Sequence, residues 1–429
     1  MPSTGGILLS SRAAHHQAVV DRYQAERRLP SLAVGVLDGP ELVWSGTAGH
    51  RTTTETQYRI GSVTKVLTAV LVMQCRDDGL LDLDDELGRL LPECGYPTAT
   101  VRDVLAHVSG MQSEPVGAWW ERAPGGTIEE LLAANDGSGS VFEPRDRYHY
   151  SNLGYALLGE AVARLRGESW SDLVQSRVLE PLGLTRTTRH PEAPYAEGLS
   201  VHHLAGTLTV EPAHDTGAMA PAGQLWSTIE DLAGFAAFLT VGHPGVLPPT
   251  TLAEMRQPVP PAIDYGLGIR LVPYAEGTLV GHTGSMPGFQ SAVFVDPRRR
   301  IGVVALTNAT TGFSGPELAL ALIGDRTPAP AEPWRPTIVV PDWARPLLGY
   351  WHWGNSAYEL RWHNDRLEWR DLARSAVSEQ FAWDGDRIVG TAGYHHGETL
   401  HVIRDEDGKI ERLECATFLY TRQPYPNGA

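Results

Sequence analysis

Residues 58–69, YRIGSVTKVLTA, contain the feature that decides the fold: a serine, Ser62, followed three positions later by a lysine, Lys65. Lys65 and Lys409 are the only lysines among the 35 lysines and arginines of the chain. A neutral lysine amine can take a proton from a hydroxyl group, whereas an arginine guanidinium keeps its own proton at physiological pH. A lysine retained beside a serine in an arginine-rich chain therefore points to a serine nucleophile with a lysine base.

The same stretch predicts the start of a helix. Apolar residues recur at spacings of three and four after Ser62, and Gly79 is suited to end the helix. Ser62 and Lys65 would then share one face of its first turn. The N–H of Ser62 would be free to stabilise a negative charge there. Because Ser-x-x-Lys is a common tetrapeptide, the pair needs support from elsewhere in the chain.

Residues 150–152, YSN, offer a second set of suitable groups. The hydroxyl of Tyr150 can relay a proton, and the amide of Asn152 can position a substrate carbonyl. Taken alone, a buried tyrosine followed by a helix N-cap is the better interpretation of this tripeptide.

Residues 281–288, GHTGSMPG, form a third set. His282 is a candidate cation, hydrogen-bond donor or proton relay, although a single histidine near a strand end is usually structural. Thr283 and Gly284 are candidate substrate-binding residues, because a glycine lets a ligand approach a strand closely. The N–H of Ser285 would supply a second donor to an oxyanion.

In this order the three sets resemble the motifs of the serine β-lactamase and penicillin-binding-protein superfamily. The resemblance covers roughly residues 15–325 and includes LAHVSGM at 105–111, PLGL at 181–184 and AGQLWSTIEDL at 222–232. The similar branch contains class C β-lactamases, D-aminopeptidases and esterases. It implies an α+β fold, with an all-α subdomain beside an α/β subdomain that holds an antiparallel sheet.

The resemblance also implies the roles of individual residues. Ser62 would be the acylated nucleophile, Lys65 its base and Tyr150 the proton relay. Asn152 would hold the substrate amide, and the N–H groups of Ser62 and Ser285 would bind the oxyanion.

Two positions depart from the family pattern. Class C β-lactamases and many D,D-peptidases have lysine where this chain has His282, so attraction for a substrate carboxylate would be weaker and pH-dependent. That difference argues against β-lactam hydrolysis as the main activity. Trp226 stands where a small or aliphatic residue is usual: an indole facing the cleft would favour an aromatic or apolar substrate, and a tryptophan buried in the fold is an equally good interpretation.

The composition changes near residue 327, so we predict three parts: a catalytic domain over residues 1–326, a proline-rich linker over 327–341 and a small β domain over 342–429. Seven of the twelve tryptophans follow residue 330, in segments that alternate apolar and polar residues. The last part resembles the lipocalin-like barrel attached to some members of the superfamily. Arg422 is a candidate to steer a peptide terminus, although a solvated arginine is the simpler interpretation.

Charge and composition exclude several classes of function. The formal net charge of -16 and the absence of a basic stripe argue against a nucleic-acid partner, and no apolar run is long enough to span a bilayer. Residues 1–10 lack the charged start of a secretory signal, and three cysteines suit a reducing compartment, so we expect a cytoplasmic protein. We expect no cofactor and no metal, because Ser-Lys-Tyr chemistry needs neither and the paired histidines lack a metal-binding pattern.

The resemblance leaves two kinds of enzyme open. One is a D-stereospecific peptidase, aminopeptidase or esterase. The other is a stand-alone penicillin-binding-protein-type thioesterase, which releases a nonribosomal peptide from a carrier protein by head-to-tail cyclisation. We favour the second, because a cytoplasmic location and a barrel that keeps water from the acyl-enzyme would both suit it. A binding protein with a degraded site would have lost Ser62, Lys65 or Tyr150, and all three are present.

Overall fold

The computed structural model describes residues 4–50 and 52–425, which divide into two units. Unit 1 comprises Met1–Leu199 and Val210–Pro333, and unit 2 comprises Ser200–Thr209 and Trp334–Ala429. The outer limits of the predicted domains, residues 1 and 429, lie outside the described residues. A short segment from the middle of the chain therefore belongs with the C-terminal part.

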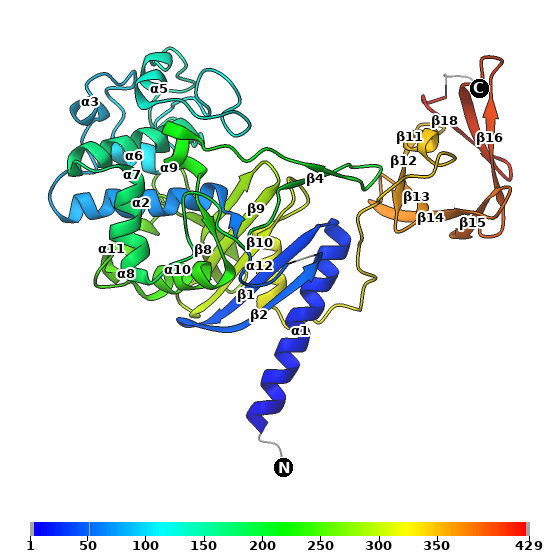
Figure 1. Ribbon diagram of the computed structural model, residues 1–429, viewed down its shortest axis with the longest axis horizontal. Coiled ribbons are helices and arrows are strands. Elements are labelled where there is room, and N and C mark those ends of the chain that lie inside the picture. The colour runs from blue at the N-terminus through cyan, green and yellow to red at the C-terminus, as the bar shows by residue number, and fades with distance from the viewer. Residues whose placement is uncertain (1–3, 51, 426–429) are drawn as a thin grey trace. The chain divides into compact units, whose positions relative to one another are not determined.

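Unit 1 is built on an antiparallel sheet whose six strands lie in the order β2-β1-β10-β9-β8-β7 (Figure 1). Early and late parts of the chain meet at its centre, where β1 pairs with β10 from Leu32↔Thr307 to Asp38↔Ile301. The strands are β1 (Ser31–Asp38), β2 (Glu41–Gly49), β7 (Arg270–Tyr274), β8 (Gly277–Met286), β9 (Phe289–Asp296) and β10 (Ile301–Thr307). The predicted antiparallel sheet is confirmed.

Helices cover both faces of this sheet. α1 (Thr4–Arg27) and α12 (Gly315–Ile323) pack on one face, where Val20, Tyr23 and Leu318 join one apolar core (Figure 1). α10 (Ile229–Val241) packs on the other face, where Phe235 and Phe238 join the main core. The inner strands β1, β9 and β10 therefore bury side chains on both faces, and the sheet is a rigid support.

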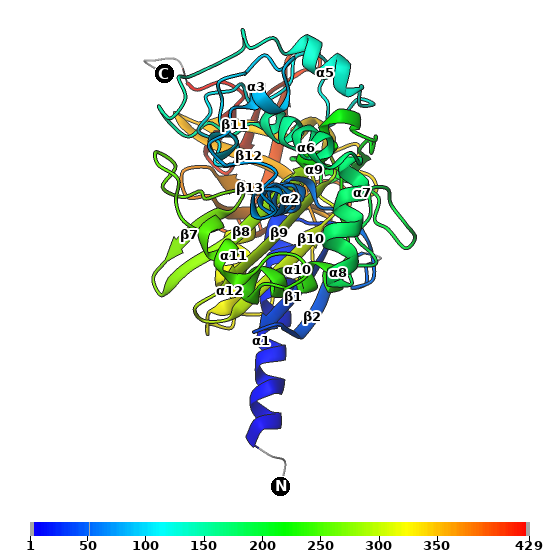
Figure 2. The same cartoon turned by 90° about the vertical axis from the view of Figure 1, so that its left-hand side faces the viewer.

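The rest of unit 1 is mainly helical, and α2 (Thr64–Asp77), α6 (Asn152–Arg166) and α9 (Ala220–Gly223) gather side by side in it (Figure 2). α2 ends as predicted, with Gly79 in a left-handed conformation at φ +72°. The shorter helices are α3 (Leu87–Leu90), α4 (Val101–Leu105), α5 (Ile128–Ala134), α7 (Trp170–Val174), α8 (Glu180–Leu182) and α11 (Pro249–Met255). Two short strands, β3 (Tyr58–Arg59) and β6 (Trp226–Ser227), pair beneath α2 and α9.

Unit 2 is a closed barrel of eight strands, which confirms the predicted small all-β domain. Its strands are β11 (Gly349–Trp353), β12 (Ser356–His363), β13 (Arg366–Asp371), β14 (Ala376–Trp383), β15 (Ile388–Ala392), β16 (Thr399–Arg404), β17 (Ile410–Cys415) and β18 (Phe418–Thr421). Trp351 and Trp369 are among the side chains that fill the barrel core. The tryptophan-rich composition of this region thus supplies its apolar interior.

The hairpin of β4 (Leu199–Val201) and β5 (Leu208–Val210) joins the barrel. The carbonyl of Leu204 accepts a hydrogen bond from the N–H of Trp362 at 2.8 Å, and Ala205 enters the barrel core. His203 contacts the buried Glu359 carboxylate at 2.7 Å. No helix within residues 4–50 and 52–425 is long and apolar enough to cross a membrane.

Candidate active site

A cavity of about 520 Å³ opens beside Ser62 in unit 1. Its wall is formed by the end of β8, the start of α12 and two loops. The lining residues are Ser62, Tyr148, Tyr150, Asp264, Tyr265, Arg270, His282, Thr283, Gly284, Ser285, Gln290, Phe313, Ser314, Gly315 and Pro316. Ser62, Tyr150 and residues 282–285, predicted from the sequence, therefore meet at one cavity.

Close backbone contact with β8 fixes the position of Ser62. A Cβ atom on Gly61, which has φ +50°, would lie 2.6 Å from the Ser285 nitrogen, and a Cβ atom on Gly284 would lie 1.8 Å from the Ile60 oxygen. Only glycine permits this approach at either position. The contact places Ser285 next to the residue before Ser62, so the two predicted oxyanion donors come from neighbouring backbone segments.

Lys65 lies in the first turn of α2 and is fully buried. Its Nζ donates to the Ser62 Oγ at 3.0 Å and to the Ala222 carbonyl at 2.6 Å. Among the described residues, no carboxylate forms an ion pair with it. Burial lowers the pKa of Lys65 to about 7, although the more distant carboxylates of Glu114 and Glu121 oppose this shift. A large share of Lys65 is therefore neutral near pH 7 and competent to deprotonate Ser62.

Tyr150 lies on the other side of the nucleophile, with its ring centre 5.0 Å from the Lys65 Nζ. Burial raises the pKa of Tyr150, while hydrogen bonding to Ser62 opposes the rise. Tyr150 therefore keeps its proton in the resting site and can donate it to a leaving group. The prediction from the tripeptide at 150–152 had no means of showing this protonation state.

His107 supports Tyr150 and was not predicted as a site residue, although the segment 105–111 was. The two rings lie 4.2 Å apart. The Nδ1 of His107 accepts from the Ser151 N–H at 3.0 Å, so its proton sits on Nε2. Burial lowers the pKa of His107 well below its usual value. A neutral, fixed imidazole thus holds the tyrosine segment in place.

Asn152 is the first residue of α6 and is buried, 7% exposed. Its Nδ2 donates to the Glu114 carboxylate at 2.7 Å. Its Oδ1 has no hydrogen-bond partner among the described residues. Glu114 is a second residue that the sequence prediction missed, because Ser-Glu-Pro at 113–115 matches no catalytic pattern.

The structure corrects the prediction of His282 as a catalytic cation. The ring is 4% exposed, its Nδ1 donates to the Thr283 carbonyl, and its Nε2 accepts from the Tyr265 hydroxyl at 2.9 Å. Burial lowers the pKa of His282 to about 3. The residue is therefore neutral, and both ring nitrogens are engaged in holding Tyr265 and the end of β8.

The positive charge in the cavity belongs instead to Arg270. This residue starts β7, pairs with Gly281 in β8 and is exposed. Among the described residues, its guanidinium has neither an ion-pair partner nor a side-chain hydrogen bond. A free guanidinium in a cavity is suited to bind a carboxylate.

Three predicted substrate-binding residues, Asn152, Trp226 and Arg422, are not among the residues that line the cavity. Trp226 is 2% exposed in β6, where its ring packs 5.1 Å from that of Phe289. Its indole is part of the core and not of the cleft. Arg422 lies in unit 2, donates to the carbonyls of Pro346, Leu348 and Tyr350, and covers the Trp351 ring at 3.9 Å. These contacts assign it a structural role in the barrel.

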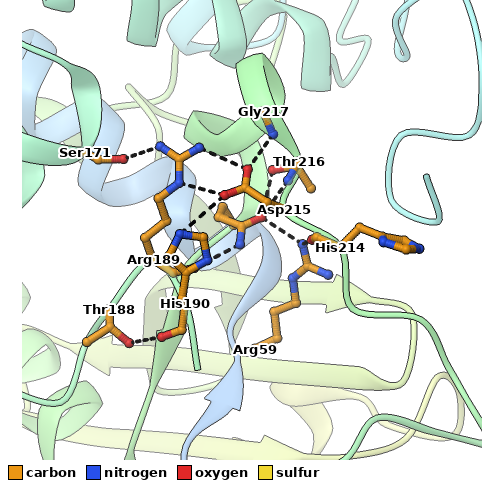
Figure 3. A network of polar contacts seen from close by, with 10 residues as sticks. Arg59, Ser171, Thr188, Arg189, His190, His214, Asp215, Thr216 and Gly217 are labelled. Carbon is orange, nitrogen blue, oxygen red and sulfur yellow. Dashed lines mark hydrogen bonds and ion pairs between the residues drawn. The ribbon is translucent and has the colours of Figure 1, made fainter. Parts of the chain in front are cut away.

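A polar network behind β3 holds the segment that receives the Lys65 amine (Figure 3). The buried Arg59 donates to the His214 carbonyl at 2.9 Å and to the Gln224 side chain at 3.0 Å. Asp215 forms a bidentate pair with Arg189, both distances being 3.0 Å. Because Gln224 follows Ala222 closely, this network fixes the carbonyl that binds Lys65. Within the described residues, no group of three His, Cys, Asp or Glu side chains could hold a metal ion.

Comparison with known proteins gives matches for both units. The β-lactamase family model matches residues 16–325, and a domain of unknown function, DUF7586, matches residues 340–422. Penicillin-binding protein 4 of Amycolatopsis lactamdurans is 30% identical over 372 residues, which are 76% of this chain and 96% of that protein. β-Lactamase-like protein 2 of Dictyostelium discoideum is 29% identical over 56% of this chain, but the alignment spans only 48% of that protein.

Solved structures are similar over different extents. The crystal structure of SurE is 25% identical with a TM-score of 0.62, and the match covers 98% of this chain and 100% of that one. D-amino acid amidase from Ochrobactrum anthropi SV3, solved with L-phenylalanine amide, is 25% identical with a TM-score of 0.61. That match covers 70% of this chain and 92% of the amidase.

Proposed function

The chain belongs to the β-lactamase family, whose members are serine hydrolases, and on this premise we propose that it transfers acyl groups of peptide substrates through an acyl-serine intermediate. The observation that carries this proposal is the Lys65 amine, buried without a carboxylate partner 3.0 Å from the Ser62 Oγ.

The reaction begins when Lys65 takes the proton of Ser62 and the Oγ attacks the substrate carbonyl. The N–H groups of Ser62 and Ser285 receive the negative oxygen that develops. The bond to the leaving thiol, alcohol or amine breaks as Tyr150 gives it a proton, and Tyr150 takes up in turn the proton that Lys65 removed from Ser62. The acyl-enzyme is then attacked by an incoming amine or by water, which loses its proton to the same Lys65–Tyr150 pair as Ser62 leaves.

For the second step, we propose attack by the amine at the far end of the same peptide. The protein would then release a nonribosomal peptide from a carrier-protein thioester by head-to-tail cyclisation, in the cytoplasm. The similarity to SurE extends over both units, so the barrel is part of an architecture that the two chains share.

A D-stereospecific peptidase or amidase is the second candidate, and Arg270 favours it. A free guanidinium in the cavity suits a substrate with a terminal carboxylate, whereas a carrier-bound thioester has none. The similarity to D-amino acid amidase supports the same candidate over unit 1.

One incubation distinguishes the two. The protein is given a linear peptidyl N-acetylcysteamine thioester that ends in a D-residue, and the products are identified by mass spectrometry. The cyclic peptide, lighter than the linear acid by one water, is expected. The linear acid as sole product would assign the protein to the second candidate.

The acyl-serine step is tested separately with a fluorophosphonate and a labelled penicillin. Intact-mass measurement and peptide mapping are expected to show one adduct on Ser62. Failure of every such electrophile to modify Ser62 in the folded protein would reject the enzymatic proposal and favour a binding function.

A further inference from the structure

One wall of the cavity beside Ser62 is made of neutral polar side chains. Gln290 in β9, Ser285 in β8 and Ser314 before α12 all line the cavity, and none of them carries a charge. The proposed acyl transfer uses only the backbone N–H of Ser285 from this wall. The side chains of the wall are therefore available to hold another part of the substrate.

The register of β8 and β9 places Gln290 beside the oxyanion site. Gln290 pairs with Ser285 in this antiparallel ladder. Directly opposite residues present their side chains on the same face of a sheet, with Cβ atoms about 4.5–5.5 Å apart. Because the Ser285 N–H is one of the two oxyanion donors, a substrate group only a few bonds from the reacting carbonyl can reach Gln290.

One hydrogen bond decides which way the Gln290 amide faces. The backbone N–H of Phe313 donates to this side chain at 3.1 Å. An N–H needs an acceptor, so the bonded atom is Oε1 and the NH₂ group is turned away from Phe313. Among the described residues, the Gln290 Nε2 has no hydrogen-bond partner. The residue therefore has a donor to offer in the cavity.

The segment that holds this amide is itself fixed. The Ser314 N–H donates to the Tyr23 hydroxyl at 2.7 Å, and the Tyr23 and Phe313 rings meet edge to face at 6.1 Å. A Cβ atom on Gly315 would lie 2.5 Å from the Ala292 Cβ, so a glycine is needed for α12 to start this close to β9. The wall is thus preorganised, and little freedom is lost when the amide binds a ligand.

We propose that the Gln290 Nε2 binds an amide carbonyl of the substrate close to the carbonyl that reacts. A carbonyl oxygen only accepts hydrogen bonds, which matches the unused donor. A neutral amide also suits a wall without charge, whereas an ammonium group would bring its own donors against that of Gln290. The inference rests on the proposed acyl-serine function and makes Gln290 a substrate-positioning residue for it.

The carbonyl can come from either side of the scissile bond. On the acyl side it belongs to the peptide bond that precedes the reacting residue. On the leaving-group side it belongs to the amide of a carrier-type thiol, which N-acetylcysteamine reproduces. Both sources present the same acceptor to Gln290.

Three thioesters distinguish the two sources. The reference is the N-acetyl-D-phenylalanyl thioester of N-acetylcysteamine, which has an amide carbonyl on both sides. The pentanethiol thioester of the same acyl group lacks the carbonyl on the leaving-group side. The 3-phenylpropanoyl thioester of N-acetylcysteamine lacks the one on the acyl side. For each thioester, kcat/KM is measured from the thiol released.

Two variants remove the donor in different ways. Gln290→Met keeps the side chain neutral and similar in length, and Gln290→Glu keeps an acceptor for the Phe313 N–H, so an effect common to both is due to Nε2. Gln290→Met should lower kcat/KM for the reference about threefold to tenfold, the usual effect of one neutral hydrogen bond. Gln290→Glu should lower it further, because a carboxylate repels a carbonyl oxygen. Gln175→Met, at an exposed glutamine outside the cavity, is the control and should leave all three rates unchanged.

The source follows from the truncated thioesters. At least one of them should be insensitive to Gln290→Met, and the carbonyl that it lacks is the one that Gln290 binds. An equal loss on all three thioesters, or no loss on the reference, would overturn the carbonyl site.

Labelling of Ser62 by an alkyl fluorophosphonate, which contains no carbonyl group, makes the two proposals fail separately. Every variant should label at the wild-type rate, and slower labelling of both Gln290 variants would overturn the site, because the substitutions would then disturb Ser62 itself. Absence of labelling in the wild-type protein would overturn the acyl-serine function. If the protein labels but releases no thiol, N-acetyl-D-phenylalanine amide should protect Ser62 from labelling better in the wild type than in Gln290→Met; equal protection would reject the site.

Discussion

Lys65 in unit 1 and Arg361 in unit 2 are basic residues with little exposed surface, and their surroundings are opposite. Lys65 is fully buried, its amine donates to a hydroxyl and a carbonyl, and no carboxylate among the described residues forms an ion pair with it. Arg361 has a side chain 11% exposed and donates twice to the Glu368 carboxylate, at 2.9 and 2.7 Å. A buried amine without a counter-charge releases its proton and becomes a base, whereas a paired guanidinium stays charged and joins two strands. A buried basic residue without a neighbouring carboxylate thus becomes a reactive base, and one that is paired with a carboxylate stabilises the fold.

The largest effect is expected from removing the neutral base. Lys65→Arg should slow fluorophosphonate labelling of Ser62 by about 10²- to 10⁴-fold, because a guanidinium does not deprotonate a hydroxyl. Lys409→Arg changes the other, exposed lysine and should label at the wild-type rate. Circular dichroism should show the same fold in both variants. Normal labelling of Lys65→Arg would mean that another group is the base.

In the barrel, the substitution Glu368→Gln removes the carboxylate that pairs with Arg361. The guanidinium is then left buried without its counter-charge. We expect the free energy of unfolding of unit 2 to fall by about 3–5 kcal/mol, measured by urea denaturation with tryptophan fluorescence. Glu411→Gln removes the exposed partner of Arg412 and should change it by less than about 1 kcal/mol. Equal effects of the two substitutions would contradict the comparison.

The titration of Lys65 sharpens the same contrast. Because burial lowers its pKa from 10.5 to about 7, the rate of Ser62 acylation should rise with pH around a midpoint near 7 and then level off. Between pH 7 and 10.5 the unfolded chain binds a proton that the folded chain has lost, so this lysine makes the protein more stable as the pH rises. The pH midpoint of acylation should stay the same in the His282→Asn variant, because a neutral histidine adds no charge beside Lys65.

The smallest effect concerns Arg270, an exposed cation that has no ion-pair partner in the described part of the chain. Arg270→Gln should raise KM about tenfold for a peptide with a free C-terminal carboxylate and leave its C-terminal amide unchanged. Arg298→Gln, at an exposed turn, is the control. Steady-state kinetics on the two peptides measure the difference. An equal change for both peptides would exclude Arg270 from carboxylate binding.

The sequence predicted the sheet, the barrel and the segments that surround the cavity, because those features depend on local pattern. Ser62 and Lys65 share a helical turn, and the glycine at position 284 is required by a backbone contact. Arg270 enters the site because β7 pairs with β8 in a hairpin, which places it opposite Gly281, next to residues 282–285. Glu114 accepts a hydrogen bond from Asn152, which lies 38 positions away in the sequence.

His282 shows the opposite limit of sequence reasoning. Its place in the motif was predicted, but its charge depends on burial and on the Tyr265 hydroxyl, which only the folded structure supplies. Trp226 and Arg422 likewise owe their roles to neighbours from distant segments. The types and the spacing of residues therefore indicated the position of the active site, and burial decided which of its groups carry a charge.

The hairpin at 200–209 means that the chain passes between the two units three times, after Leu199, Thr209 and Pro333. A chain truncated at Pro333 would keep a loop whose Ala205 methyl and Leu204 carbonyl had lost their partners in the barrel. Removing the barrel at a single position of the chain would thus leave this loop exposed, prone to aggregation and open to proteases. An engineered version of unit 1 alone therefore needs the hairpin shortened as well.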